Sequence, residues 1–188
     1  MSSQKVGPTI SDDIKKHAIM AIFFSLLIIF LYIAVRFRNW QFGLGGLVSL
    51  AHDVIIVIGM YSLLDGWLSF SLSVDMSFIA AVLTIIGYSI NDTVIVFDRI
   101  REYRHLHPKQ EPMKTYNDAM NSTLRRTFST SLTVLVVLFA IFLFGGTSIK
   151  GFVFALLMGI MFGTYSSVFI ATPVAYDTLM RKLKKENK

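Results

Sequence analysis

The chain has 188 residues, of which 54% are hydrophobic and 16% charged, and it carries a formal net charge of +6. This composition is too apolar for one soluble domain, and the length accommodates several membrane spans of about 20 residues each. The absence of cysteine excludes disulfides, thiolate metal sites and a cysteine nucleophile, and we expect neither a metal nor a cofactor.

Five apolar segments predict an all-α integral membrane protein with five transmembrane helices. A polar tail at residues 1–17 precedes a transmembrane domain at residues 18–180, with helices at about 18–35, 44–64, 78–98, 127–144 and 152–172. Between the third and fourth helices, Pro108 and Pro112 interrupt any helix, and residues 113–125 have the spacing of a short amphipathic helix on the membrane surface. Residues 181–188 form a basic tail.

The distribution of Lys and Arg predicts the orientation in the membrane. Five spans place 14 of the 18 Lys and Arg residues on the side that holds the connection at residues 99–126 and the C-terminus, and four on the other side. Because basic residues gather on the cytoplasmic side, the C-terminus is expected in the cytoplasm and residues 1–17 outside. Basic residues that flank apolar spans favour this role in topology over nucleic-acid binding.

The third segment carries Asp92 inside an apolar span. A carboxylate at this depth costs roughly 2.5 to 3.5 kcal/mol to insert, so it needs a partner, water or a function. At about 100 degrees per residue, Thr84, Tyr88 and Asp92 lie in one narrow band of the helix, with Arg99 at its end, and Asn91 lies next to Asp92 in the sequence.

The fourth segment groups Arg126, Ser129, Thr130 and Thr133 on one face. Since the two helices run in opposite directions, Arg126 is expected near the depth of Asp92, and we predict an ion pair between them. Two alternatives stay open: Arg126 anchors the helix at the cytoplasmic interface, or Asp92 is a structural, hydrogen-bonded carboxyl group.

Two further features concern the second and fifth segments. Asp53 lies near the centre of its span, where it has either a structural or a functional role, and the adjacent His52 points about 100 degrees away. In the fifth segment small residues recur every four positions, and this pattern predicts close packing of another helix against Gly159 and Gly163.

Four stretches resemble membrane motifs of the SecF family in the same order. The strongest is GYSINDTVIVFDRIRE at residues 87–102, and the others are VGPTISDDI from Val6, LAHDVIIVIG from Leu50 and LRRTFSTSLTVL from Leu124. SecF is the smaller partner of SecD in bacterial protein export and resembles one half of an RND-type transporter with six spans. The chain looks like spans two to six of that half, without the first span and the extracytoplasmic domain.

The resemblance implies a function in the bacterial inner membrane, where SecD and SecF use proton or sodium motive force to drive preprotein translocation. Asp92 and Arg126 correspond to ion-pathway residues of the family, and we include Asp53, Tyr88, Asn91 and Thr130 as further candidates for this pathway. Implied partners are SecD, fused or separate, the Sec translocon channel, the preprotein and the lipid bilayer.

Two other functions remain as alternatives. One is half of an RND-type exporter of small molecules. The other is an intramembrane aspartyl protease, in which Asp53 and Asp92 would share one proton. A nearby arginine opposes such a dyad because it favours two ionised carboxylates, and the GxGD-type sequence of these proteases is absent from GYSIND. The sequence therefore favours a transport protein over an enzyme.

Overall fold

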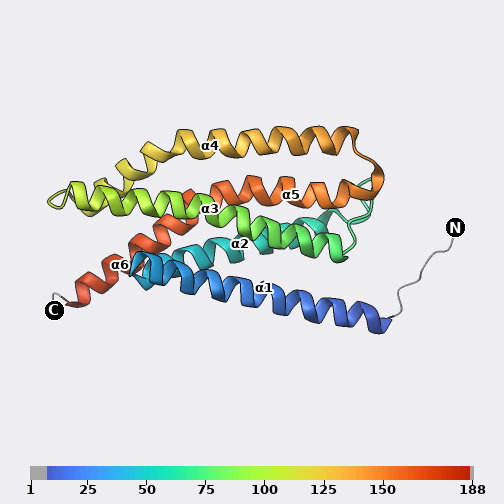
Figure 1. Ribbon diagram of the computed structural model, residues 1–188, viewed down its shortest axis with the longest axis horizontal. Coiled ribbons are helices and arrows are strands. Elements are labelled where there is room, and N and C mark those ends of the chain that lie inside the picture. Colours follow the sequence, from blue (N-terminus) through green and yellow to red (C-terminus); the bar gives the residue numbers. More distant parts are fainter. Residues whose placement is uncertain (1–7, 187–188) are drawn as a thin grey trace.

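The computed structural model describes residues 8–186 as a bundle of helices that run along one common direction (Figure 1). Within this part of the chain there is no strand. The helices are α1 (Pro8–Phe37), α2 (Trp40–Leu64), α3 (Met76–Leu106), α4 (Pro112–Phe144), α5 (Thr147–Ser166) and α6 (Thr172–Glu186), with a π-helical segment η1 (Ser167–Ala171) between the last two.

Five helical stretches are long and apolar enough to cross a membrane, and the last one runs through α5, η1 and α6. Successive stretches alternate in direction, so the α1–α2 turn, the α3–α4 connection and the C-terminal helix lie at one end of the bundle (Figure 1). The other end holds the start of α1, the α2–α3 loop and the α4–α5 turn. These findings confirm the prediction of an all-α membrane protein with five spans.

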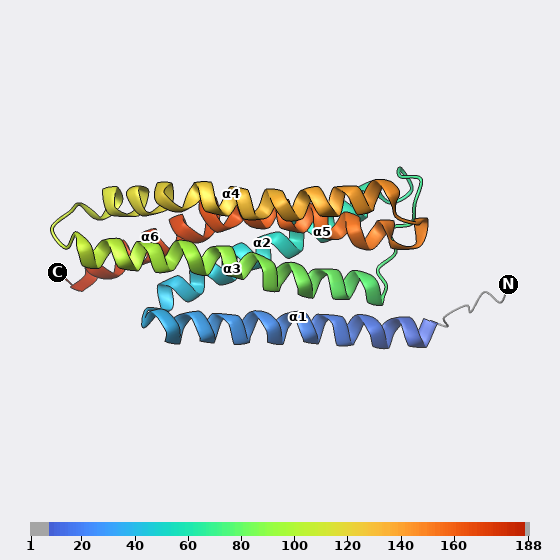
Figure 2. The same cartoon turned by 45° about the horizontal axis from the view of Figure 1, so that its top comes forward.

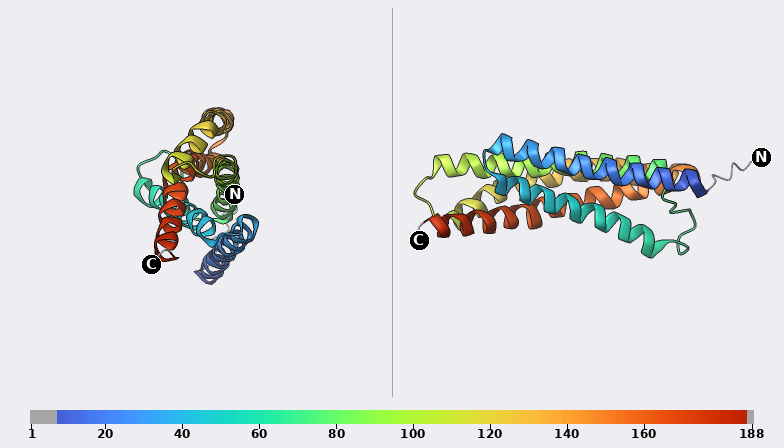
Figure 3. Two further views of the ribbon diagram at one scale, coloured as in Figure 1. Left: turned by 90° about the vertical axis from the view of Figure 1, so that its left-hand side faces the viewer. Right: turned by 90° about the horizontal axis from the view of Figure 1, so that it is seen from below.

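The helices differ in how deeply they are buried. In the most apolar stretch of each helix, 67% of the residues are buried in the fifth span and 50% in α3, against 17% in α4 and 6% in α1. Seen end-on, α1 and α4 lie on opposite sides of the bundle (Figure 3). The third and fifth spans therefore form the centre, and α1 and α4 present wide apolar faces outward.

The helices extend beyond the ranges expected from hydropathy. Residues 112–144 form one continuous helix, so the expected surface helix at 113–125 is the first part of α4 (Figure 2). Pro112 begins this helix rather than interrupting it, because the first turn needs no backbone donor at that position. Likewise α1 begins at Pro8, inside the expected tail, whose residues 1–7 lie outside the described part, as do residues 187–188 of the basic tail.

Small residues let the central helices approach one another closely. A side chain on Gly159 would collide with Ile85 of α3, and a Cβ on Gly163 would lie 3.0 Å from the Cβ of Ser89. At Gly45 of α2, an added Cβ would meet the backbone oxygen of Ala171. The predicted small-residue face of the fifth span thus lies against α3, and a second close approach joins α2 to η1.

A polar layer separates two apolar clusters in the interior. The first cluster contains α3 residues up to Ile86 and α5 residues up to Ile160, and the second begins at Val96 and Ala171 on the same two spans. Between them, the chain places buried carboxyl and hydroxyl groups from four helices, namely Asp53, Ser89, Asp92, Thr93, Ser131, Thr164, Ser166 and Ser167. This layer contains the candidate site.

Candidate functional site

Asp92 lies in the polar layer with only 2% of its surface exposed. Ser131 Oγ of α4 donates a hydrogen bond to Asp92 Oδ2 at 3.2 Å. Thr164 Oγ1 of α5 lies 2.7 Å from Ser131 Oγ and 2.9 Å from the Ile160 carbonyl oxygen. The carboxyl group of Asp92 is therefore linked through two hydroxyl groups to both α4 and α5.

Arg126 does not form the predicted ion pair with Asp92. Among the ion pairs of residues 8–186, none joins the two side chains within 4.0 Å, and Arg126 is exposed. It lines a surface pocket of about 280 Å³ together with Asp98, Arg99 and Glu102. The partner of Asp92 is Ser131, which lies five residues further along α4, or about 7 Å deeper in the bundle. The comparison of helical faces correctly predicted that α3 and α4 are neighbours at Asp92, but it placed Arg126 at the wrong depth.

The other polar candidates of α3 and α4 differ in how near they lie to this contact. Tyr88 is half-buried beside the first apolar cluster and interacts with Ser131, whereas Asn91 is exposed. The exposed Thr130 donates within its own helix, with its hydroxyl 2.9 Å from the Thr127 carbonyl and 3.1 Å from the Arg126 carbonyl. Asn91 and Thr130 thus face outward from the bundle and do not contact the Asp92 carboxyl group.

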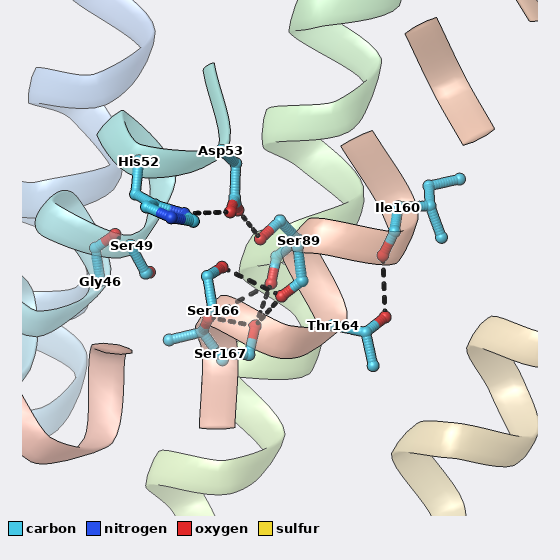
Figure 4. Close-up of polar contacts among 11 residues, drawn as sticks. Gly46, Ser49, His52, Asp53, Ser89, Ile160, Thr164, Ser166 and Ser167 are labelled. Carbon is cyan, nitrogen blue, oxygen red and sulfur yellow. Dashed lines mark hydrogen bonds and ion pairs between the residues drawn. The ribbon is translucent and has the colours of Figure 1, made fainter. Parts of the chain in front are cut away.

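Asp53 occupies a second position in the polar layer and is completely buried. Ser89 Oγ of α3 donates to Asp53 Oδ2 at 2.7 Å, and His52 Nδ1 lies 3.3 Å from Asp53 Oδ1 (Figure 4). The expected divergence of His52 from Asp53 therefore does not keep the two side chains apart. Ser49, one turn before Asp53, donates to the Gly46 carbonyl at 2.9 Å instead.

Hydroxyl groups connect the Asp53 contact to the π-helical segment. Ser167 Oγ lies 3.3 Å from the Ser89 carbonyl (Figure 4). It also lies 2.8 Å from Thr93 Oγ1 and 2.9 Å from the Gly163 carbonyl. The π-helical turns begin at Ser167, the residue that makes these contacts. Single π turns inside α-helices are frequent at functional sites. The polar layer thus lies where the fifth span departs from α-helical geometry.

Sequence reasoning missed the hydroxyl partners of both carboxyl groups. Ser89, Ser131 and Thr164 are ordinary residues in membrane helices, where a hydroxyl can bond its own backbone. One available signal was spacing: Ser89 and Thr93 lie four residues apart on the face of α3 that meets the small-residue face of the fifth span.

The geometry gives no support to a shared-proton protease dyad. Asp53 bonds to Ser89 and His52, Asp92 bonds to Ser131, and no hydrogen bond joins the two carboxyl groups in the described part of the chain. The same described residues contain no cluster of three or more His, Asp or Glu side chains that could hold a metal ion. What the layer offers is two separate buried carboxyl groups within hydroxyl networks, an arrangement able to bind and release a proton or small cation.

Comparison with known proteins identifies the family. The profile described as "Protein export membrane protein SecD/SecF, C-terminal" matches residues 1–181. The chain is 51% identical over 176 residues to the protein translocase subunit SecF of Rhodothermus marinus, and 42% identical over 181 residues to that of Haemophilus influenzae. These alignments cover 94% and 96% of this chain, respectively.

A solved structure has the same fold. The structure titled "Crystal structure of SecDF in Super-membrane-facing form" matches with a TM-score of 0.83 and 40% sequence identity, and covers 97% of this chain and 23% of that one. The chain spans 57% of the length of the Rhodothermus relative and 54% of the Haemophilus relative. By sequence and by fold, the chain belongs to the SecD/SecF C-terminal family of protein-export membrane proteins.

Proposed function

We propose that this chain is the membrane part of a SecF export subunit and couples proton or sodium motive force to Sec-dependent preprotein translocation. The observation that carries the proposal is the Asp92 carboxyl group, which is buried in the membrane-spanning bundle and connected through Ser131 and Thr164 to two other helices. A change in the charge of Asp92 would affect the packing of α3, α4 and α5, because each of these helices contributes a polar group to the same network.

The proposed cycle uses two states of Asp92. When protonated, the neutral carboxyl group is satisfied by the hydroxyl of Ser131, as the geometry allows. When ionised, the carboxylate requires a cation. Arg126 lies on α4 five residues before Ser131, toward the α3–α4 connection, and is within electrostatic range of Asp92. One elementary charge crossing 100 mV releases roughly 2.3 kcal/mol, which is available to shift α4 against α3.

The proposed partners follow from the relatives. SecF relatives are named translocase subunits, and the solved neighbour carries the joined name SecDF. We infer that SecD, the Sec translocon channel and the preprotein are partners of the whole protein to which this sequence corresponds. The exposed apolar residues of α1 and α4, such as Val35 and Val136, provide surfaces for lipid or for a partner helix.

The proposed sidedness can be tested because the chain has no native cysteine. A cysteine at Ser148, in the exposed start of α5, is expected to react with an impermeant thiol reagent added to intact cells. A cysteine at Lys109, in the exposed α3–α4 connection, is expected to react only after the cells are opened. Labelling of Lys109→Cys in intact cells would show that the chain has the opposite orientation.

The export function is tested by replacing the corresponding part of a relative. A chimera joins the N-terminal part of the Haemophilus influenzae SecF to residues 1–188 of this chain, and is expressed in cells depleted of their own SecF. We expect it to restore secretion of a Sec-dependent reporter, whereas the N-terminal part alone does not. Equal secretion with and without the chimera, at matched membrane levels of the two proteins, would refute the proposed function.

A further inference from the structure

A cationic pocket lies at the end of the bundle that holds the α1–α2 turn and the end of α3. It has a volume of about 360 Å³, and its polar lining includes Arg38, Arg101, Arg104 and His105. No carboxylate is among the residues that line it in the described part of the chain. A concave site lined by one sign of charge concentrates ions of the opposite sign.

The arginines of this pocket lack the carboxylate partners that neighbouring arginines have, and Arg104 interacts only with the phenol of Tyr116 among the described acidic groups. Just outside it, Arg36 pairs with Asp98 at 3.5 Å, and Arg99 pairs with Glu102 at 2.6 Å. Among the described residues, no ion pair within 4.0 Å involves Arg38, Arg101 or Arg104. Three like charges are thus held around one cavity without an internal anion, and a bound anion would relieve their repulsion.

The backbone of the α1–α2 turn adds to the attraction for an anion. Arg38 has a φ of 54°, in the left-handed region that an arginine rarely adopts, and this conformation belongs to the turn that forms the pocket wall. Asn39 follows as the N-cap of α2 but makes no side-chain cap, since its Nδ2 donates to the Phe37 carbonyl at 3.1 Å. The N-terminal N–H groups of a 25-residue helix therefore begin beside the arginines without a side-chain acceptor.

The pocket has a rigid apolar floor. Phe37 and Phe42 line it and are both buried, and their rings pack against Phe97 of α3 with centroids 5.9 Å and 4.9 Å away. The arginines therefore lie beside a packed aromatic cluster and not on a mobile loop.

The level of the pocket relative to the membrane indicates which kind of anion it binds. In the sequence, Val35 precedes the α1–α2 turn and is 77% exposed, and Trp40 follows the turn at the start of α2 and is 52% exposed. Exposed tryptophan next to arginine at the end of an apolar span is typical of the headgroup level of a membrane. Basic pockets between membrane helices at this level suit anionic headgroups. We propose that this pocket binds the phosphate group of an anionic phospholipid.

The test compares two lipids that have the same acyl chains and a phosphate group, one with an anionic and one with a zwitterionic headgroup. The full chain is purified, freed of lipid, and titrated with dioleoylphosphatidylglycerol or dioleoylphosphatidylcholine, and bound lipid is counted by native mass spectrometry. The triple variant Arg38→Asn, Arg101→Gln, Arg104→Gln removes the three charges, and asparagine tolerates the left-handed backbone at residue 38. We expect phosphatidylglycerol to bind the triple variant at least about tenfold more weakly than the native chain, with phosphatidylcholine binding unchanged.

A matched control removes the same number of positive charges outside the pocket. Lys109→Gln, Lys114→Gln, Arg125→Gln removes three exposed basic residues that do not line this pocket, and is expected to keep native binding of phosphatidylglycerol. The single variant Arg104→Gln, at an exposed position, serves if the triple variant does not fold, and is expected to weaken phosphatidylglycerol binding about threefold. Native binding by a folded pocket variant, or equal losses in pocket and control variants, would overturn the proposal. Displacement of the lipid by millimolar inorganic phosphate would assign the pocket to a soluble anion instead.

Discussion

Replacing Asp92 with Asn is expected to abolish ion-driven export while leaving the protein assembled. Asparagine keeps the volume of the side chain and can still accept the hydrogen bond that Ser131 donates at 3.2 Å. It cannot bind or release a proton or balance a cation, so the charge change that the proposed cycle requires is lost. The measurement is reporter secretion by the chimera in SecF-depleted cells, with and without an ionophore that collapses the ion gradient.

The exposed carboxylate Asp98 provides the control for this prediction. It lies on the same helix and pairs with Arg36 at 3.5 Å on the surface, where an ion pair contributes little. Asp98→Asn is therefore expected to secrete the reporter at the native rate, while Arg126→Ala should fail like Asp92→Asn. If Asp92→Asn secretes at the native rate and still responds to the ionophore, Asp92 is a structural residue and the coupling mechanism is wrong.

Replacing Gly159 and Gly163 together with Leu is expected to destabilise the bundle by several kcal/mol, since overpacking of a filled site costs about 1 to 3 kcal/mol. Even a Cβ at Gly159 would collide with Ile85, and one at Gly163 would press on Ser89 at 3.0 Å. The same change would force α5 away from α3, where the polar layer lies. Thermal unfolding in detergent, followed by circular dichroism, measures the loss.

Met161 provides the comparison within the same helix. Its side chain is 46% exposed, so Met161→Leu changes the shape of an outward residue and is expected to shift the unfolding temperature little. Equal unfolding temperatures for the glycine variant and Met161→Leu would show that close approach of α3 does not depend on these glycines.

The fold was largely predictable because membrane insertion imposes strong rules on sequence. Each span must be apolar over about 20 residues, and all five were located by this property. Helix ends were less predictable because helices that leave the membrane continue into water, where hydropathy gives no signal. Thus α3 extends to Leu106 and α4 begins at Pro112, leaving a short connection where a longer one was expected.

The candidate site was predictable only in its charged members. Asp53 and Asp92 stood out because carboxylates are rare in apolar spans. Their hydroxyl partners did not, since Ser131 in the network and Thr130, which bonds its own helix, are adjacent residues of similar chemistry. Only the packing of α4 against its neighbours distinguishes them. The same packing sets the depth of α4, which explains why Arg126 was placed too close to Asp92.

The π-helical segment determines which residues of α6 face the protein. A residue added to one turn of an α-helix rotates everything that follows by about 100 degrees. In the observed phase, Ala175 meets Gly45 of α2 and Leu179 is buried in the second apolar cluster, while Lys184 and Lys185 remain exposed. Deleting one residue between Ser167 and Ala171 would turn this pattern by more than a quarter of a revolution, carrying Leu179 out of the interior. The π-helical segment thus fixes how far α6 is rotated about the helix axis relative to α5.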